Sequence, residues 1–408
     1  MGNKNENGFF EKGGFVAGAT IVINTYSWFF PLYFLVEKVF DQTFEYFNSI
    51  LLFGIFYVIA FLSPFAGVFI ASRVLKRDKL LILWMCIGTV TSALSIFNLE
   101  IRDLNRYCLM FSLLGISLGL GFPSCLAYFA DYNSTEKSGR NAGLVFLISG
   151  IGILLVGVIT SILPVVISFV ILALWRMVGC ILFILGKPVK EKIAVGNVIP
   201  SYRQVVTGKK FALYFIPWVM CCVINYLEAS LLKDFFGLEF SYFVPLAEFG
   251  IAGVIAVISG CISDLIGRKR IVVFGFVILG IGYALLGLFP TNTASWYFYV
   301  IADGIAWGVF AVMYFLLLWG ELAENRQKEK YYLLGEMPYL VLSYIGILIK
   351  PYIVIISVSS AFSLASFFLF LAVVPLMYAP ETLPERKLRE RELRSYIEKA
   401  KKVKEKFT

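Results

Sequence analysis

Residues 260–270 read GCISDLIGRKR, and they separate two long apolar segments near 242–263 and 270–290. An apolar run of about 20 residues is long enough to cross a lipid bilayer as a helix. The glycines permit close helix approach and a reversal of the chain, and three adjacent cations favour an aqueous surface. The stretch therefore predicts a tight turn at a membrane surface between two spanning helices.

Apolar segments of similar length recur on both sides of this turn. Of the 408 residues, 59% are hydrophobic and only 15% are charged, whereas soluble domains carry about 25% charged residues. The segments are too long for the roughly 10-residue alternating strands of a membrane barrel. The sequence therefore predicts an all-α membrane protein with twelve transmembrane helices, near 14–36, 47–71, 80–98, 107–130, 141–163, 165–186, 211–233, 242–263, 270–290, 296–320, 331–350 and 354–378.

The positions of the cations predict the orientation of these helices. If the N-terminus is cytoplasmic, the inner segments hold 30 of the 36 Lys and Arg residues and the outer segments hold five. Such a bias marks the cytoplasmic face, so we expect a multi-pass protein of the cell membrane with both termini inside. Two uncharged outer turns, 161–164 and 290–295, leave eleven or thirteen spans as alternatives, although either number would break the alternation.

The composition disfavours several kinds of chemistry. The chain has no histidine, and its seven cysteines are irregularly spaced without a C-x-x-C pair, so we expect no metal site and no disulfide framework. No phosphate-binding G-x-x-x-x-G-K-[ST] run occurs. The net charge of +9 follows from cations on one membrane face and requires no nucleic-acid partner. We therefore expect no cofactor, no catalytic residues and no enzymatic activity.

The longest inner loop, 187–210, divides the chain into two similar halves. Residues 1–186 and 211–378 each contain six predicted spans, and a basic segment at 379–408 follows. The first span of each half contains the tripeptide Val-Ile-Asn, and both fourth spans carry paired glycines and end in an acid. Duplicated bundles that face each other rock about a central site and expose it to each side in turn. We therefore predict two six-helix bundles joined by a cytoplasmic linker.

With the spans assigned, residues 260–270 resemble the G-x-x-x-D-x-x-G-[RK]-[RK] turn of the major facilitator superfamily. The resemblance implies a cytoplasmic gate in which Arg268 and Lys269 pair with Glu321, at the end of the fourth span of the same half. In the first half, Ala71 occupies the position of the aspartate, and nearby cations remain that can meet an acid. The predicted gate residues are Gly260, Asp264, Gly267, Arg268, Lys269, Glu321, Asp131 and Arg140.

Two further stretches are similar to the sugar and organic-solute:proton symporters of that superfamily. They are the fourth span around 113–119 and the run APETLPE at 379–385. The first span departs from those symporters because it carries Asn24 and no acid. The resemblance implies a secondary active transporter that moves a small organic solute, such as a sugar or an organic acid, together with protons. A proton-driven drug or metabolite exporter and a non-transporting receptor or scaffold remain as alternatives.

Three acids lie inside predicted spans of the second half, where an ionised group is costly. Glu228, Glu248 and Asp303 lie at similar depths, about 24–27 Å from the inner ends of their spans at 1.5 Å per residue. We expect a carboxylate cluster that carries a proton or binds a cationic group. The alternative is that these side chains are simply hydrated near the outer surface.

Polar and aromatic side chains share faces of the first, seventh and tenth spans, which line the cavity in the superfamily that this chain resembles. Apart from ordinary helix packing, which is the alternative, the predicted solute contacts are Asn24, Trp28, Asn225, Trp307 and Tyr314. Arg176 in the sixth span either snorkels to the surface or hydrogen-bonds to a neighbouring helix. Glu336 lies just inside the eleventh span, where we expect a structural cap or a gate group.

The partners expected for this chain are a small-molecule substrate, protons and membrane lipids, and we expect a monomer. Basic residues and apolar residues recur at helical spacing in the tail 379–408. Such a helix lies on the inner membrane surface and is attracted to anionic lipids. The alternative is a solvated tail.

Overall fold

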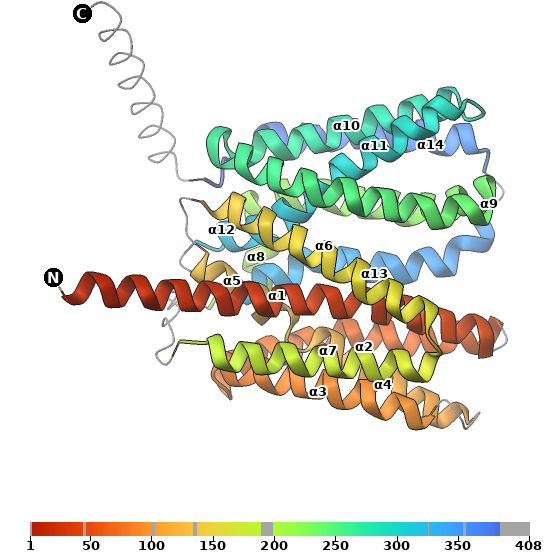
Figure 1. Ribbon diagram of the computed structural model, residues 1–408. Helices are drawn as coiled ribbons and strands as arrows, with labels where there is room; N and C mark the ends of the chain where they lie inside the picture. The colour runs from red at the N-terminus through yellow and green to blue at the C-terminus, as the bar shows by residue number, and fades with distance from the viewer. Residues whose placement is uncertain are drawn as a thin grey trace, which may run out of the picture.

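The computed structural model describes residues 2–43, 46–98, 103–133, 137–188, 199–324, 326–353 and 356–383. It is a bundle of long helices that run side by side (Figure 1). Twelve helical stretches in the described residues are long and apolar enough to cross a membrane, and each overlaps one of the twelve predicted spans. The prediction of an all-α, twelve-span fold is therefore confirmed, and the chain is a multi-pass membrane protein.

Seven helices form the first six spans. They are α1 (Gly2–Thr43), α2 (Tyr46–Arg73), α3 (Arg77–Asn98), α4 (Leu104–Gly119), α5 (Phe122–Tyr132), α6 (Ser138–Ile162) and α7 (Val165–Gly186). Helices α4 and α5 belong to a single span that is interrupted at Leu120 and Gly121. Pro123 lies in the first turn of α5, where its missing N–H costs nothing. The carbonyl of Leu120 lies so close to Gly67 of α2 that a side chain on Gly67 would overlap it.

The second six spans follow the short helix α8 (Tyr202–Val206). They are formed by α9 (Lys209–Ile266), α10 (Arg268–Leu288), α11 (Thr293–Phe310), the π-helix η1 (Ala311–Leu318), α12 (Trp319–Leu322), α13 (Lys328–Ile353) and α14 (Val358–Tyr378). The seventh and eighth predicted spans both fall within α9, at Lys209–Leu227 and Ala247–Ile266. The tenth span, Thr293–Leu322, contains η1, so the fourth and tenth spans are both irregular. Such irregular turns are frequent at functional sites.

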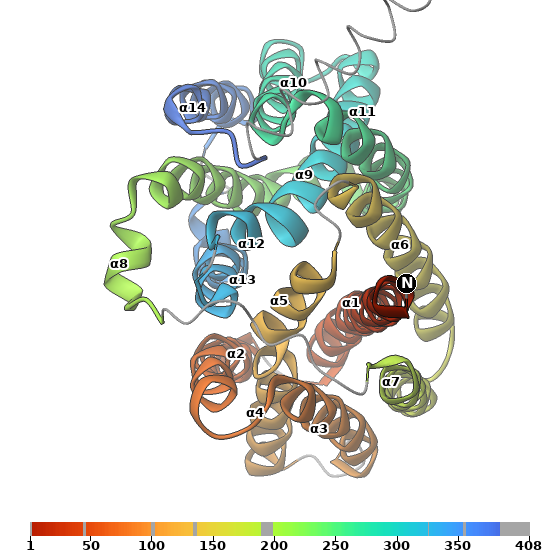
Figure 2. The same ribbon diagram turned by 90° about the vertical axis from the view of Figure 1, so that its left-hand side faces the viewer.

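The two halves of the chain lie on opposite sides of the bundle when it is viewed end-on (Figure 2). Helices α6 and α13 lie in the seam between them. Helix α6 packs against α1 and α9, and α13 packs against α2 and α9. Each half therefore contributes one helix to a contact with the other half.

Burial separates the central spans from the peripheral ones. The fourth and tenth spans are 72% and 83% buried, whereas the twelfth span is 33% buried. Apolar side chains such as Phe69, Leu155 and Leu364 are exposed on the outside, as a surface that meets lipid requires. The two irregular spans therefore lie at the centre, where the halves meet.

The beginning of α1 and the end of α14 lie at the same end of the bundle (Figure 1). Gly14 contacts Tyr132 at the end of α5, and the carbonyl of Met377 accepts a hydrogen bond from Lys269. We refer to this end as the Gly267 end, after the residue that separates α9 from α10. The predicted tail at 379–408 lies outside the described residues beyond Leu383.

Candidate functional site

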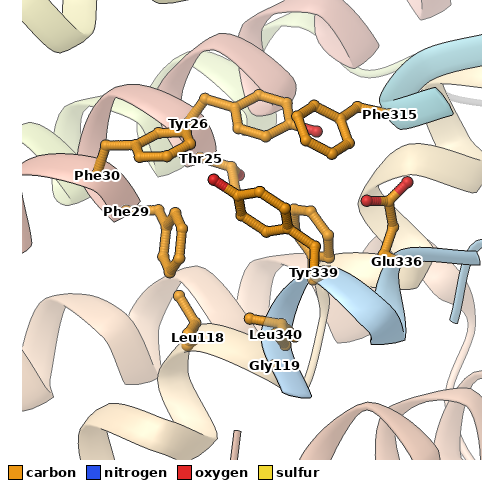
Figure 3. Close-up of a pocket in the computed structure, with 11 residues that line it drawn as sticks. Thr25, Tyr26, Phe29, Phe30, Leu118, Gly119, Phe315, Glu336, Tyr339 and Leu340 are labelled. Carbon is orange, nitrogen blue, oxygen red and sulfur yellow. The ribbon is translucent and has the colours of Figure 1, made fainter. Parts of the chain in front are cut away.

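Two adjoining cavities lie where the halves meet, with empty volumes of about 500 and 640 Å³. They share a wall that consists of Phe29, Phe30, Leu118, Tyr339 and Leu340. The first cavity is also lined by Thr25, Tyr26, Gly119, Phe122, Phe315 and Glu336 (Figure 3). The second cavity is completed by Tyr33, Phe34, Phe56, Tyr57, Tyr226, Phe249 and Ser343.

Aromatic rings make up most of this lining. Tyr26, Phe29, Phe30 and Tyr33 follow one face of α1 at a spacing of three and four residues. On the opposite side, Phe315 of η1 stacks against Tyr26 with ring centroids 6.2 Å apart. The lining therefore presents mainly ring faces, and its hydrogen-bonding groups are five tyrosine hydroxyls, Thr25, Ser343 and Glu336.

Glu336 brings a carboxyl group to this aromatic lining. Its side chain is 5% exposed, and its Oε1 accepts a hydrogen bond of 3.0 Å from Nε1 of Trp319. Helix α13 begins at Lys328, so Glu336 lies two turns inside the helix, beyond the reach of the free N–H groups. Of the two expectations for Glu336, the helix cap is wrong, and the gate group stays a prediction.

Asn24 and Trp28, two predicted solute contacts, point away from the cavities. The Asn24 amide donates to the carbonyl of Trp175 at 2.8 Å and accepts from Nη1 of Arg176 at 3.0 Å. The ring of Trp28 lies 4.7 Å from the Arg176 guanidinium. Both side chains therefore face α7, on the side of α1 opposite the aromatic lining.

Arg176 is fully buried, so the snorkelling interpretation is wrong and the hydrogen-bonded alternative holds. Its guanidinium lies between the rings of Trp28 and Trp84, 4.7 and 4.2 Å from their centroids. It also donates to Thr25 at 3.1 Å. Ring faces attract a cation in a dry environment, so this contact joins α1, α3 and α7 inside the first half.

The predicted contacts of the second half lie outside the lining of the two cavities. Tyr314 stacks on Trp218 at 4.5 Å, and its hydroxyl donates to the carbonyl of Tyr214. Trp307 packs edge-on against Tyr339 at 6.1 Å. Asn225 is half-buried on α9. None of the five predicted solute contacts is among the described residues that line either cavity.

One sequence signal could have identified the true lining. Tyr26, Phe29, Phe30 and Tyr33 form a continuous aromatic stripe, but the polar face at Asn24 was preferred because polar groups in a membrane helix suggest function. The choice between two faces of one helix depends on which face meets the other half.

Two of the three predicted membrane acids come together. The carboxyl groups of Glu248 on α9 and Asp303 on α11 are hydrogen-bonded to each other, and Asp303 also contacts Trp307. Asp303 is 4% exposed. A hydrogen bond between two carboxyl groups requires a proton on one of them. The side chain of Glu228 lies outside the described residues.

At the Gly267 end, Asp264 joins the two halves. Its carboxylate accepts from the backbone N–H groups of Gly139 and Arg140, at 3.0 and 2.9 Å, where α6 begins. A carboxylate at a helix N-terminus satisfies free N–H groups and is favoured by the helix dipole. Gly260 permits this approach, because a side chain there would overlap the carbonyl of Gly139. The side chain of Arg140 is exposed.

Arg268 is the centre of this contact. Its buried guanidinium pairs with Asp264 at 2.9 Å and with Glu321 at 3.2 Å, and it donates to Ser138 of α6 at 2.6 Å. Lys269 donates instead to the carbonyl of Met377 at 2.6 Å, so its predicted pairing with Glu321 is wrong. We call Ser138, Asp264, Arg268 and Glu321 the Arg268 cluster.

The APETLPE run completes the same end. Glu381 accepts from the backbone N–H groups of Arg268 and Lys269, at 2.7 and 3.2 Å, and so caps α10. Thr382 donates to Glu321. Between the two helices, Gly267 has a φ of 101°, which a side chain would strain.

A second ion-pair cluster joins the halves through α13. Arg77 at the start of α3 pairs with Asp131 of α5 and with Glu329 of α13. The Nε of Arg77 donates to Oε1 of Glu329 at 2.7 Å. Lys328 of α13 also pairs with Asp131, at 2.7 Å. We call Arg77, Asp131, Lys328 and Glu329 the Arg77 cluster.

The profile of the Major Facilitator Superfamily matches residues 15–318 of this chain. The proton:xylose symporter XylE, bound to 6-bromo-6-deoxy-D-glucose, superimposes with a TM-score of 0.65 at 14% identity, over 92% of this chain and 96% of its own. The transporter FucP in the outward conformation superimposes with a TM-score of 0.69 at 12% identity, over 90% of this chain and 100% of its own. The human organic anion transporter MFSD10 (TETRAN) superimposes with a TM-score of 0.62 at 16% identity, over 90% of this chain and 99% of its own. A comparison with curated sequences found no match.

Proposed function

This chain belongs to the Major Facilitator Superfamily, and on that premise we propose that it moves a small organic solute across the cell membrane by alternating access, driven by protons. The observation that carries the proposal is a central cavity between two halves that ion pairs and a helix cap join at one end. Breaking those contacts would let the halves separate there and open the cavity to that side. The cation bias supports a cytoplasmic location for the Gly267 end, with both termini on that side.

The Glu248–Asp303 pair is the proposed site of proton coupling. Two carboxyl groups in contact inside a membrane cannot both be ionised at low cost, so they share a proton. Glu248 lies on α9 and Asp303 on α11, so gain or loss of that proton changes how these helices pack. Asp303→Asn should abolish accumulation of solute against a gradient while leaving solute exchange measurable. Equal accumulation by the variant and the parent protein would remove Asp303 from the mechanism.

Symport of the solute with protons is the first expectation, as in XylE, which is a proton:xylose symporter. The aromatic cavity lining favours a second candidate, export of an apolar or cationic solute in exchange for protons. Sugars are recognised through many hydrogen bonds, whereas ring faces make up most of this lining. We further propose that the chain acts as a monomer and that its basic tail contacts anionic lipids.

Uptake into proteoliposomes tests these alternatives. With an inward proton gradient, a symporter accumulates its solute, and an exporter in the same orientation expels a preloaded one. A receptor or scaffold binds its ligand without flux. Solute flux that no proton gradient affects would contradict proton coupling, and a fixed open pore would contradict alternating access.

A further inference from the structure

Glu336 has no charge partner in the described part of the chain. One oxygen accepts from Trp319, and no lysine or arginine side chain of the described ranges forms an ion pair with Glu336. An anionic group in a low-dielectric interior needs a proton or a cation to balance it. The side chain also lines the cavity (Figure 3). A cation that balances it can therefore be a bound ligand.

The hydroxyl of Tyr26 is a second unsatisfied group in the same cavity. Tyr26 is 4% exposed, and its hydroxyl is buried without a hydrogen-bond partner among the described residues. Tyr26 and Glu336 line the same cavity from opposite halves of the chain (Figure 3). A buried hydroxyl without a partner is costly, so a donor from a ligand would satisfy it.

Ring faces surround these two groups. Phe315 stacks on Tyr26, and Tyr339 packs edge-on against Phe315 at 5.4 Å. Phe29 and Phe30 extend the lining along α1, away from Glu336 (Figure 3). Aromatic faces attract organic cations and also accommodate an apolar body.

We infer that this cavity selects a monovalent organic cation with an apolar or aromatic body, whose ammonium group lies between the Glu336 carboxylate and the Tyr26 hydroxyl. The inference deepens the proposed transport function and rests on it. It favours protonated aromatic amines over sugars, and it disfavours organic acids because Glu336 would repel them. The ligand body would lie among Phe29, Phe30 and Phe315.

Four probes that share a phenylethyl body separate the contribution of the charge from that of the hydrogen bond. Phenylethylammonium carries the predicted group, 2-phenylethanol is its neutral analogue, and 3-phenylpropionate reverses the charge. Phenylethyltrimethylammonium keeps the charge but has no N–H donor. Binding to the full chain in lipid nanodiscs is measured by titration calorimetry, with empty nanodiscs subtracted. Phenylethylammonium should bind at least about tenfold more tightly than either uncharged or anionic analogue.

Two variants assign the effect to residues. Glu336→Gln keeps an acceptor for Trp319 and should weaken phenylethylammonium binding about tenfold or more, with 2-phenylethanol changed less than about twofold. Tyr26→Phe should weaken phenylethylammonium binding several-fold and leave phenylethyltrimethylammonium unchanged. Matched controls are Glu324→Gln at the exposed Lys210 pair and Tyr283→Phe in the interior of the second half. Neither control should alter binding of any probe.

Unaltered phenylethylammonium binding by Glu336→Gln, or equal affinity of the parent protein for 3-phenylpropionate, would overturn the inference. Binding of 2-phenylethanol shows that the Glu336 variant is folded, so a loss of structure is not mistaken for support. The assay needs no flux. A chain that binds the cation but carries no solute would therefore contradict the proposed function alone, and proton-driven flux of another solute without cation binding would contradict this inference alone.

Discussion

The Arg268 and Arg77 clusters join the two halves at the same end of the molecule by different means. In the Arg268 cluster, Asp264 bonds directly to the backbone where α6 begins. In the first half, Ala71 stands at the matching position, and the start of α13 is held by the side-chain pair of Arg77 and Glu329. The comparison teaches that one seam uses a helix cap and the other uses ion pairs between side chains.

The two kinds of contact differ in strength. In the contact at α6, the side chains of Arg268 and Asp264 are 0% and 9% exposed. In the contact at α13, those of Lys328 and Asp131 are 19% and 14% exposed, and those of Arg77 and Glu329 are 13% and 4% exposed. Water and salt screen an exposed pair more than a buried one. A backbone cap also fixes the orientation of the capped helix, because the N–H groups at a helix N-terminus do not move separately from the helix. We therefore expect the contact at the start of α13 (the α13 seam) to open more readily than the contact at the start of α6 (the α6 seam).

The largest effect is expected from Asp264→Ala. The change removes the cap of α6 and one partner of the buried Arg268, at a cost of about 3 kcal/mol at this end of the molecule. Transport should fall to near background. A cysteine in place of Ser138, which is buried at the start of α6, should become accessible to a membrane-impermeant thiol reagent, whereas the same cysteine in the parent protein stays protected. Parent-like transport together with a protected thiol would show that the cap does not hold the gate closed.

Arg77→Gln should have a smaller effect on the same measurements. It breaks the partly exposed pair with Asp131 and the pair with the buried Glu329. The cost should be about 2 kcal/mol, because glutamine can still donate a hydrogen bond to Glu329 and Lys328 stays paired with Asp131. The unfolding midpoint in nanodiscs should fall less than for Asp264→Ala, and added salt should reduce the difference between variant and parent. A loss as large as that of Asp264→Ala would contradict the proposed difference between the seams. Glu324→Gln, at an exposed pair, serves as the control.

Ala71→Asp tests the comparison in the opposite direction. If the first half can accept the missing aspartate, a carboxylate there would cap α13 and stabilise the closed end by about 0.5–1 kcal/mol. The unfolding midpoint should rise slightly, and transport should slow because the seam opens less often. Ala71→Asn, which can cap but carries no charge, should show a weaker version of the same result. Faster transport by Ala71→Asp would contradict this account.

Some structural features depend on short stretches of the sequence alone. Apolar length defines a span without reference to any other part of the chain, and all twelve predicted spans overlap a described helix. The pairing of Arg268 with Glu321 was predictable because Arg268 belongs to a recognisable motif, and Glu321 is the acid that this motif is expected to meet. The Glu248–Asp303 contact followed from depth, because residues at equal height in neighbouring helices can meet.

The residues that line the cavity could not be predicted in the same way. Asn24 and Tyr26 are two positions apart on α1, yet Asn24 faces Arg176 and Tyr26 faces the cavity. A helix with polar groups on one face and aromatic rings on the other can pack either way, and nothing within α1 decides which. The position of Glu336 near the start of the eleventh span suggests a cap or a gate group, and nothing in the neighbouring sequence indicates a cavity wall.

The sequence by itself determined the number of spans and the residues of the second-half motif, because hydropathy and turn chemistry act over fewer than about 25 neighbouring residues. Only the tertiary structure decided which faces meet. Asp264 caps a helix 125 residues earlier in the chain, and Tyr26 reaches the same cavity as Glu336 from the other half. Such contacts depend on how each helix is rotated against its neighbours, and that rotation is set by the packing of the whole bundle.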